Sequence, residues 1–237
     1  MSGRPDEPSS DVCLVVDVDE TLLNPLPRWA ERVNDRFGWD VDLSQVELAG
    51  GWDNLLAEHP DYDAFSTFAD FLRADPEFNT GLDPIAGALD AMGVLCGLPR
   101  VRIGCYLTTR PFRVADATGA DLRRLGFPSA PVIARPDGVD RADTVEWKVG
   151  ELEHLLKSEP GEVVIIDDNL GLGRRLCERN EHASKAIVSI VFLGPLTVAE
   201  AHLRNLRSRP DRHFYIADWQ GIVAIVKMRV ASLTGEL

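Results

Sequence analysis

The chain has few cysteines and histidines, and those present are scattered. There are four cysteines and five histidines in 237 residues, with no C-x-x-C and no H-x-x-x-H spacing. The common zinc motifs are therefore absent. Because two of the cysteines fall inside predicted strands, we expect buried, reduced thiols instead of metal ligands or disulfides. The cysteines are Cys13, Cys96, Cys105 and Cys177.

Long apolar runs are also missing. No segment approaches the roughly 18 to 20 residues that a membrane-spanning helix requires, so we expect a soluble protein without a membrane partner. Residues 1–10 are polar and proline-rich and lack the apolar core of a secretory signal. We therefore expect a disordered tail there and a cytoplasmic location.

Positive charge is in short supply. Lysine and arginine number 25 against 38 acidic residues, which gives a formal net charge of −13. Such a charge repels polyanions, so a nucleic-acid partner or an anionic membrane surface is not expected. A small anionic substrate is still compatible, because a cation inside a pocket can reverse the local field.

Short apolar runs alternate with helical patterns along most of the chain. Continuous apolar runs are typical of strands covered on both faces. The alternation predicts an α/β fold with a doubly wound, mainly parallel Rossmann-like sheet, whose ligands bind at the carboxyl ends of the strands. The predicted strands are LVV after Cys13, VRIGCYL, PVIA, VVIIDD, AIVSIVFLG and HFYIADW, and a closing helix follows in GIVAIVKMRV.

The segment 25–82 differs from the rest because it is mostly helical and rich in aromatic residues. We interpret it as an inserted helical cap, with 11–24 and 83–237 forming the α/β core. One predicted helix carries Trp29, Val33 and Phe37 at intervals of four and ends at Gly38. A second apolar stripe, in which the phenylalanines are expected to form the core of the cap, comprises Ala64, Phe65, Phe68, Phe71 and Leu72.

Two helix starts are predicted from local signals in the core. Asp83 and Pro84 suit the N-cap and first position of a helix through Met92. Asp143 with Glu146 three positions later resembles a capping box, which would place Lys148 in the first turns of its helix.

Acidic residues follow two of the predicted strands directly. The run DVCLVVDVDETLL ends in Asp17 and Asp19, and VVIIDD ends in Asp167 and Asp168. Parallel strands end at one edge of a sheet, so these carboxylates are expected to converge and repel one another unless a cation neutralises them. Oxygen ligands with open coordination positions suit Mg²⁺.

The order of these motifs resembles the haloacid dehalogenase superfamily of phosphatases. The superfamily's first motif, D-x-D-x-T after an apolar strand, matches residues 17–21. Its second, a Thr or Ser at a strand end, matches Thr108, and its third, a lone lysine, matches Lys148. The fourth, paired acids after an apolar strand, matches VVIIDD, so the resemblance extends from about Val12 to Phe192.

The resemblance implies a role for each acidic residue. Asp17 would be the nucleophile, forming an aspartyl-phosphate, and also a Mg²⁺ ligand. Asp19 would be the general acid and base and would ligate the metal through its backbone carbonyl. Asp167 would complete the metal shell, with Asp168 as a further or alternative ligand. Dehalogenating members lack the second acid of the first motif, so Asp19 favours phosphate chemistry.

The resemblance also implies how the phosphoryl group would be held, and several alternatives stay open. Thr108 would bind phosphoryl oxygens, with Thr109 as a competitor for that role, and Lys148 would pair with them and with the nucleophile. Arg110 could contact the substrate or could bond the adjacent helix and loop. Trp52, within the cap, could contact the substrate or could pack within its own loop.

Together these features predict a Mg²⁺-dependent phosphomonoester hydrolase acting on a small soluble phosphorylated metabolite. A nucleotide or nucleic-acid-end phosphatase of the same superfamily is the alternative, and a catalytically silent phosphate-binding or regulatory protein is the second. The sequence leaves the particular substrate and the oligomeric state open.

Overall fold

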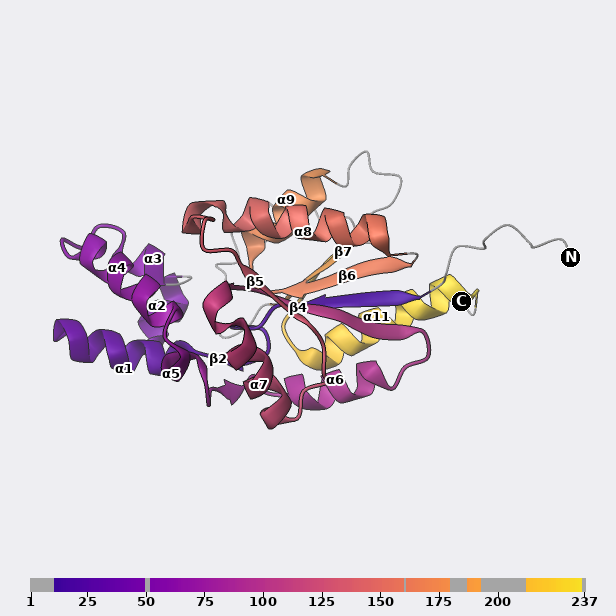
Figure 1. Cartoon of the computed structure of the whole chain (residues 1–237), viewed down its shortest axis with the longest axis horizontal. Helices are drawn as coiled ribbons and strands as arrows, with labels where there is room; N and C mark the ends of the chain where they lie inside the picture. The colour runs from indigo at the N-terminus through magenta and orange to yellow at the C-terminus, as the bar shows by residue number, and fades with distance from the viewer. Residues whose placement is uncertain (1–10, 50–51, 160, 180–186, 193–211, 236–237) are drawn as a thin grey trace, which may run out of the picture.

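A computed structural model describes residues 11–49, 52–159, 161–179, 187–192 and 212–235, so the predicted tail at 1–10 lies outside the described residues (Figure 1). Within them, a six-stranded sheet has the order β5-β4-β1-β6-β7-β8, and every neighbouring pair is parallel. The predicted doubly wound α/β fold is confirmed. The strands are β1 (Val12–Val16), β4 (Val101–Pro111), β5 (Val132–Arg135), β6 (Glu162–Asp167), β7 (Val188–Phe192) and β8 (His213–Ile216).

Helices cover both faces of this sheet. In Figure 1, α8 and α9 lie on one side of the strands and α6 and α11 on the other. The helices of the core are α6 (Ala88–Cys96), α7 (Ala115–Leu125), α8 (Thr144–Ser158), α9 (Leu170–Arg179) and α11 (Trp219–Thr234), with short 3-10 turns η1 (Phe112–Val114) and η2 (Arg141–Asp143). None of the helices in the described part of the chain has the length and apolar character of a membrane span.

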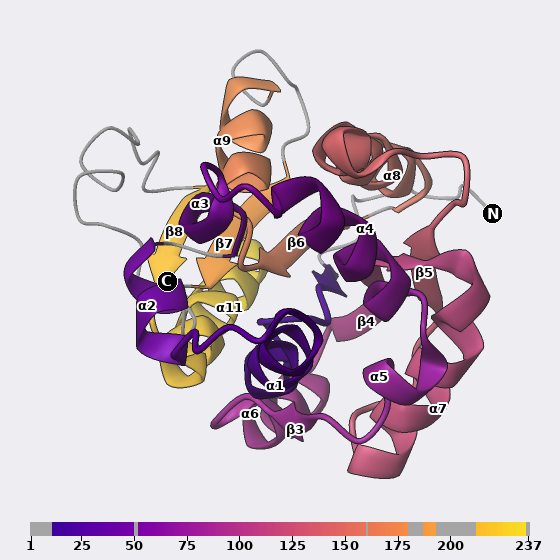
Figure 2. The same ribbon diagram turned by 90° about the vertical axis from the view of Figure 1, so that its left-hand side faces the viewer.

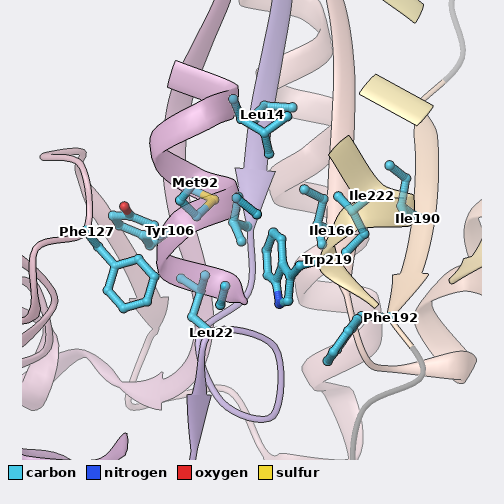
Figure 3. Packing of buried hydrophobic residues seen from close by; sticks show 14 of the residues in the cluster. Leu14, Leu22, Met92, Tyr106, Phe127, Ile166, Ile190, Phe192, Trp219 and Ile222 are labelled. Atoms are coloured by element: carbon cyan, nitrogen blue, oxygen red, sulfur yellow. The ribbon is translucent and has the colours of Figure 1, made fainter. Parts of the chain in front are cut away.

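The central position of β1 explains why its residues are all apolar and do not alternate with polar ones. Leu14 and Val16 pack in the cluster that includes α6 and α11, whereas Cys13 and Val15 pack in the cluster that includes α8 and α9. Figure 3 shows Trp219 of α11 among the buried side chains of the first cluster. Both faces of the strand are thus buried, as expected for a parallel sheet covered by helices.

Five helices of the segment between β2 and β3 form a separate layer over one end of the sheet (Figure 2). They have their own apolar cluster, which includes Trp29, Val33, Phe65 and Phe78. The helix with Trp29 and Val33 ends at Gly38, as predicted, with the glycine in the left-handed region at φ 67°. The helices are α1 (Leu26–Phe37), α2 (Leu43–Ala49), α3 (Trp52–Leu56), α4 (Tyr62–Arg73) and α5 (Pro76–Asn79).

The two connections between this helical layer and the core run side by side. β2 (Leu23–Asn24) pairs in antiparallel fashion with β3 (Asp83–Pro84). Arg28 of α1 ties the beginning of the layer to its end, because its guanidinium donates hydrogen bonds to the carbonyls of Phe78, Thr80 and Gly81 at 2.6–2.9 Å. The helical layer therefore enters and leaves the core through one narrow joint.

The predicted helix start at Asp83 and Pro84 is wrong. These residues form β3, and the Ile85 N–H donates to the carbonyl of Leu22 at 2.8 Å. Helix α6 begins only at Ala88, after Gly87 in the left-handed region at φ 79°. Pairing with β2 thus prevents Asp83 and Pro84 from capping a helix.

The predicted capping box of α8 is also wrong, although the helix itself is confirmed. The Asp143 side chain makes no capping hydrogen bond. The carboxylate of Glu146 instead accepts hydrogen bonds from Arg175 at 2.5 Å and Arg179 at 2.8 Å. These arginines lie on α9, so the acid joins two neighbouring helices.

Two members of the predicted stripe on α4, Ala64 and Phe71, are exposed and do not belong to the core of the helical layer. Phe65 is buried and Phe68 packs against the cluster, but Phe71 is 63% exposed. At about 100° per residue, Phe71 lies roughly 240° around the helix from Phe65, which turns it toward solvent.

Candidate active site

Asp17 and Asp167 emerge side by side because their strands are neighbours in register. Val16 of β1 pairs with Ile166 of β6, so the next residue of each strand is a buried aspartate. Lys148 of α8 lies between them, and its Nζ donates to Asp17 Oδ1 and to Asp167 Oδ2, both at 2.7 Å. The structure therefore brings together three residues that the sequence predicted to meet.

Asp168 joins this group to form a compact acidic cluster. One carboxylate oxygen each from Asp17, Asp167 and Asp168 lies within 4.8 Å of the others. Burial raises the pKa of Asp17 to about 7, against the lowering effect of Lys148. Burial and the charges of Glu20, Asp17 and Asp167 raise the pKa of Asp168 as well.

One ammonium does not balance these carboxylates. Burial alone would lower the pKa of Lys148, but the charges of Asp167 and Asp17 outweigh it and raise that pKa, so the side chain stays protonated. A hard divalent cation supplies the missing positive charge and takes oxygen ligands. The donor set of Asp17, Asp167 and Asp168 therefore fits Mg²⁺.

A tight turn after β1 directs the next two acids into the same pocket. The N–H groups of Leu22 and Leu23 both donate to the carbonyl of Val18 at 2.9 Å. Glu20 has φ 61°, a left-handed conformation that is uncommon for a residue other than glycine. The turn is backed by Trp219, whose Nε1 donates to the Thr21 carbonyl at 3.3 Å.

Arg110 holds the carboxylate of Asp19 in a bidentate pair. Its Nε donates to Asp19 Oδ2 at 2.9 Å and its Nη2 to Oδ1 at 2.6 Å. The buried Nη1 donates to the carbonyl of Asn79 at the end of α5 and to the hydroxyl of Thr118 on α7. Of the two alternatives left open for Arg110, the structure shows the bonds to the adjacent helix and loop.

The remaining predicted residues lie at different depths. Thr108 is fully buried within β4, three residues before the strand ends, and its hydroxyl accepts a hydrogen bond from the Arg110 N–H at 3.2 Å. Thr109 lines the pocket above the acidic cluster. Trp52 does not line that pocket; its ring packs 6.0 Å from the ring of Phe65 within the helical layer.

The pocket is a cavity of about 170 Å³ between the sheet edge and the helical layer. The acids and Lys148 form its core side, and Trp29, Arg73 and Phe78 of the helical layer also line it. Sequence reasoning missed Arg73, because an arginine at the end of a helix belongs to no motif. It also missed Asn169, although the third polar residue of VVIIDDN was a usable signal.

Glu20 is a further acid that sequence reasoning left without a role. Its Oε2 is buried and accepts no hydrogen bond from the described residues. Burial and the charge of Asp19 raise the pKa of Glu20 to about 7, and Arg73 has the opposite, smaller effect. Glu20 adds to the negative charge that faces the pocket.

These raised pKa values predict that the metal-free protein loses stability as the pH rises. The folded Asp17 and Glu20 carboxyls keep a proton up to about pH 7, whereas ordinary carboxyls release it near 3.8 and 4.5. Between these values the folded state binds more protons, so the free energy of unfolding falls by up to about 1.4 kcal/mol per pH unit for each group.

Urea denaturation in EDTA at pH 5.5 and pH 8 would measure this loss. We expect Mg²⁺ to offset it at pH 8, because the ion binds the ionised carboxylates of the folded state. We expect Asp168→Asn to reduce the loss, and Asp90→Asn on the exposed side of α6 to leave it unchanged. Equal stability at both pH values without metal would contradict the charge balance described here.

Some solved structures resemble this protein in fold. No protein-family model and no curated protein matches the chain. A phosphonoacetaldehyde hydrolase-like protein from Oleispira antarctica matches the structure with a TM-score of 0.55 and 12% identity, covering 98% of both chains. A candidate beta-phosphoglucomutase from Bacteroides vulgatus matches with a TM-score of 0.51 and 13% identity, covering 96% of this chain and 91% of the other.

Both of these proteins are members of the haloacid dehalogenase superfamily. The chain shares its α/β fold with both proteins over nearly its whole length. The α/β fold predicted from the alternation of strands and helices is thus also found in these solved structures.

Proposed function

We propose that this chain is a Mg²⁺-dependent phosphomonoester hydrolase that works through an aspartyl-phosphate on Asp17. The observation that carries the proposal is the Lys148 bridge between Asp17 and Asp167, with Asp168 in the same cluster and Asp19 two residues beyond the nucleophile. This arrangement offers a nucleophile, a metal-binding set and a proton donor at the edge of one sheet.

We assign each step to a residue of the site. A carboxylate oxygen of Asp17 attacks phosphorus, the ester P–O bond breaks, and the leaving oxygen takes a proton from Asp19. Asp19 then removes a proton from the water that attacks the aspartyl-phosphate, which releases inorganic phosphate and restores Asp17. Thr109, which lines the pocket, Thr108 and Lys148 are proposed to bind the phosphoryl oxygens.

Mg²⁺ would be held by the carboxylates of Asp17, Asp167 and Asp168 and by the Asp19 carbonyl, and it would neutralise charge on the phosphoryl group. Lys148 supplies a fixed positive charge that contacts both Asp17 and Asp167. Since Lys148 stays protonated, its charge favours the ionised form of Asp17, which is the form that attacks.

The bidentate pair with Arg110 defines the resting state of Asp19. In this pair the carboxylate is occupied on both oxygens and is not placed to donate a proton. Asp19 must therefore leave Arg110 to protonate the leaving group. Because Arg110 also binds the Asn79 carbonyl, a shift of the helical layer at α5 would accompany this release.

The size of the pocket supports a small substrate. A cavity of about 170 Å³ under the helical layer suits a small phosphate ester better than a polymer end. The net charge of −13 supports the same choice over a nucleic-acid end. We therefore propose the helical layer α1–α5 as the cap that closes over the substrate.

Hydrolysis of 4-nitrophenyl phosphate and of an alkyl phosphate, with Mg²⁺ and with EDTA, tests the proposal. We expect both esters to be hydrolysed in the presence of Mg²⁺ and neither in EDTA. Asp19→Asn should lower kcat/KM about 10²- to 10⁴-fold for the alkyl ester, whose leaving group needs a proton, and far less for the nitrophenyl ester.

Two outcomes would count against this assignment. Equal losses on both esters would contradict the acid role of Asp19. Mg²⁺ binding without turnover across a panel of phosphate esters would favour a silent phosphate-binding protein instead.

A further inference from the structure

A second cavity adjoins the active-site pocket. Its volume is about 290 Å³, and it shares Arg73, Thr109 and Asn169 with the wall of the pocket above the acidic cluster. Arg135 at the end of β5 and Arg141 in η2 also line it. The two cavities are therefore direct neighbours.

The two cavities have opposite charge. The active-site pocket is lined by five carboxyl groups against one lysine and one arginine. The second cavity is lined by three arginines, namely Arg73, Arg135 and Arg141, against one acid, Asp70. In a chain with 38 acidic and 25 basic residues, three arginines around one hollow form a local positive field.

Two of these arginines are held in place by contacts that leave them facing the hollow. Arg135 is half-buried, with its Nε donating to the Thr109 carbonyl at 3.2 Å and its Nη1 to the Val139 carbonyl at 2.6 Å. The Arg73 guanidinium lies 5.0 Å from the centre of the Trp29 ring, and its Nη1 lies 3.5 Å from Asp70 Oδ1 in an ion pair. An arginine fixed in this way loses less conformational freedom when it binds an anion.

The arginines also come from both layers of the protein. Arg73 ends α4 of the helical layer, whereas Arg135 and Arg141 belong to the core. An anion held between them would connect the two layers on one side of the reacting phosphate. Thr109 lines both cavities, and its carbonyl accepts a hydrogen bond from Arg135.

We propose that this arginine cavity binds a second anionic group of the substrate, so that the enzyme prefers phosphate monoesters that carry a distal carboxylate or phosphate. The inference rests on the proposed phosphatase function and names the substrate class of the same site. Guanidinium groups match carboxylate and phosphate oxygens in geometry as well as charge.

Pairs of esters that differ only at the far end test this preference. Carboxyalkyl phosphates and alkyl phosphates of equal chain length, in a series of lengths, should differ in kcat/KM by about 10-fold or more in favour of the carboxylate at the best length. Aminoalkyl phosphates should be the poorest. Alkyl bisphosphates of matching length show whether a carboxylate or a phosphate is the better distal group.

Matched variants assign the preference to the cavity. Arg141→Gln and, separately, Arg135→Gln should reduce the ratio of kcat/KM between the carboxyalkyl and alkyl esters about 10-fold, and Arg141→Lys should restore part of it. Arg32→Gln removes an exposed arginine of α1 and should leave the ratio unchanged. A ratio near one in the wild type, or an unaltered ratio in both glutamine variants, would overturn the proposal.

Binding measurements keep this inference separate from the proposed function. Calorimetric titration of the Asp17→Asn protein with Mg²⁺ and the same ester pairs requires no turnover. Tighter binding of the carboxyalkyl ester, lost in Asp17→Asn combined with Arg141→Gln, supports the arginine site even if the wild type hydrolyses none of the esters. Equal binding of the two esters with good turnover would refute the site and leave the phosphatase proposal intact.

Discussion

Asp17→Asn is expected to abolish phosphatase activity, lowering kcat/KM by at least about 10⁴-fold. An amide is a poor nucleophile, but it has nearly the same shape and its oxygen can still accept the hydrogen bond of Lys148. Initial rates with 4-nitrophenyl phosphate and Mg²⁺ measure the loss. Intact-protein mass spectrometry after an acid quench should detect a phosphoryl adduct in the wild type and none in the variant.

The same substitution should leave the fold intact. It removes a carboxyl whose pKa is raised to about 7 by burial, so the metal-free variant should be at least as stable as the wild type at pH 8. Asp90→Asn on the exposed side of α6 is the matched control and should retain full activity. Retention of more than about 1% of activity in Asp17→Asn would remove Asp17 from the role of nucleophile.

Lys148→Met is expected to have the largest effect on stability. The substitution leaves Asp17 and Asp167 buried without the ammonium that bridges them, and breaking a buried pair in this way costs about 3–5 kcal/mol. The loss should appear as a lower free energy of unfolding in urea at pH 7.5 with EDTA. Activity should fall as well, because Lys148 is proposed to bind the phosphoryl group.

Two comparisons make this expectation specific. Lys157→Met, at the exposed end of the same helix, should change stability by less than about 0.5 kcal/mol. Mg²⁺ should recover part of the stability of Lys148→Met, since the ion supplies positive charge to the same carboxylates. A Lys148→Met protein as stable as Lys157→Met in EDTA would show that the bridge does not hold the site together.

The main part of the site could be predicted from the sequence because its residues follow directly from strand ends. An apolar run indicates where a buried strand stops, and once β1 and β6 are neighbours their parallel pairing places Asp17 beside Asp167. Lys148 could be placed because the helical pattern around it is clear, even though the capping signal that was used to start the helix is wrong.

Other features depend on contacts that no local pattern reports. Asp83 and Pro84 have the sequence of a helix start, yet pairing with Leu23 and Asn24 makes them a strand. Local helix propensity is overridden in this way when a segment can pair with another strand. Arg73, Arg135 and Arg141 lie on three separate elements, so only the folded chain shows that they surround one cavity.

The narrow joint between the two layers has a consequence for how the protein can be altered. Asn24 and Asp83 are opposite each other in an antiparallel pair, which is the geometry that a two-residue hairpin turn closes. The whole segment between them can therefore be exchanged for a short turn without rerouting the core, since the apolar cluster around Phe65 is separate from those of the sheet. Such an exchange would remove Arg73 and the Asn79 carbonyl from the site and leave the acids, Lys148, Arg135 and Arg141 in the core.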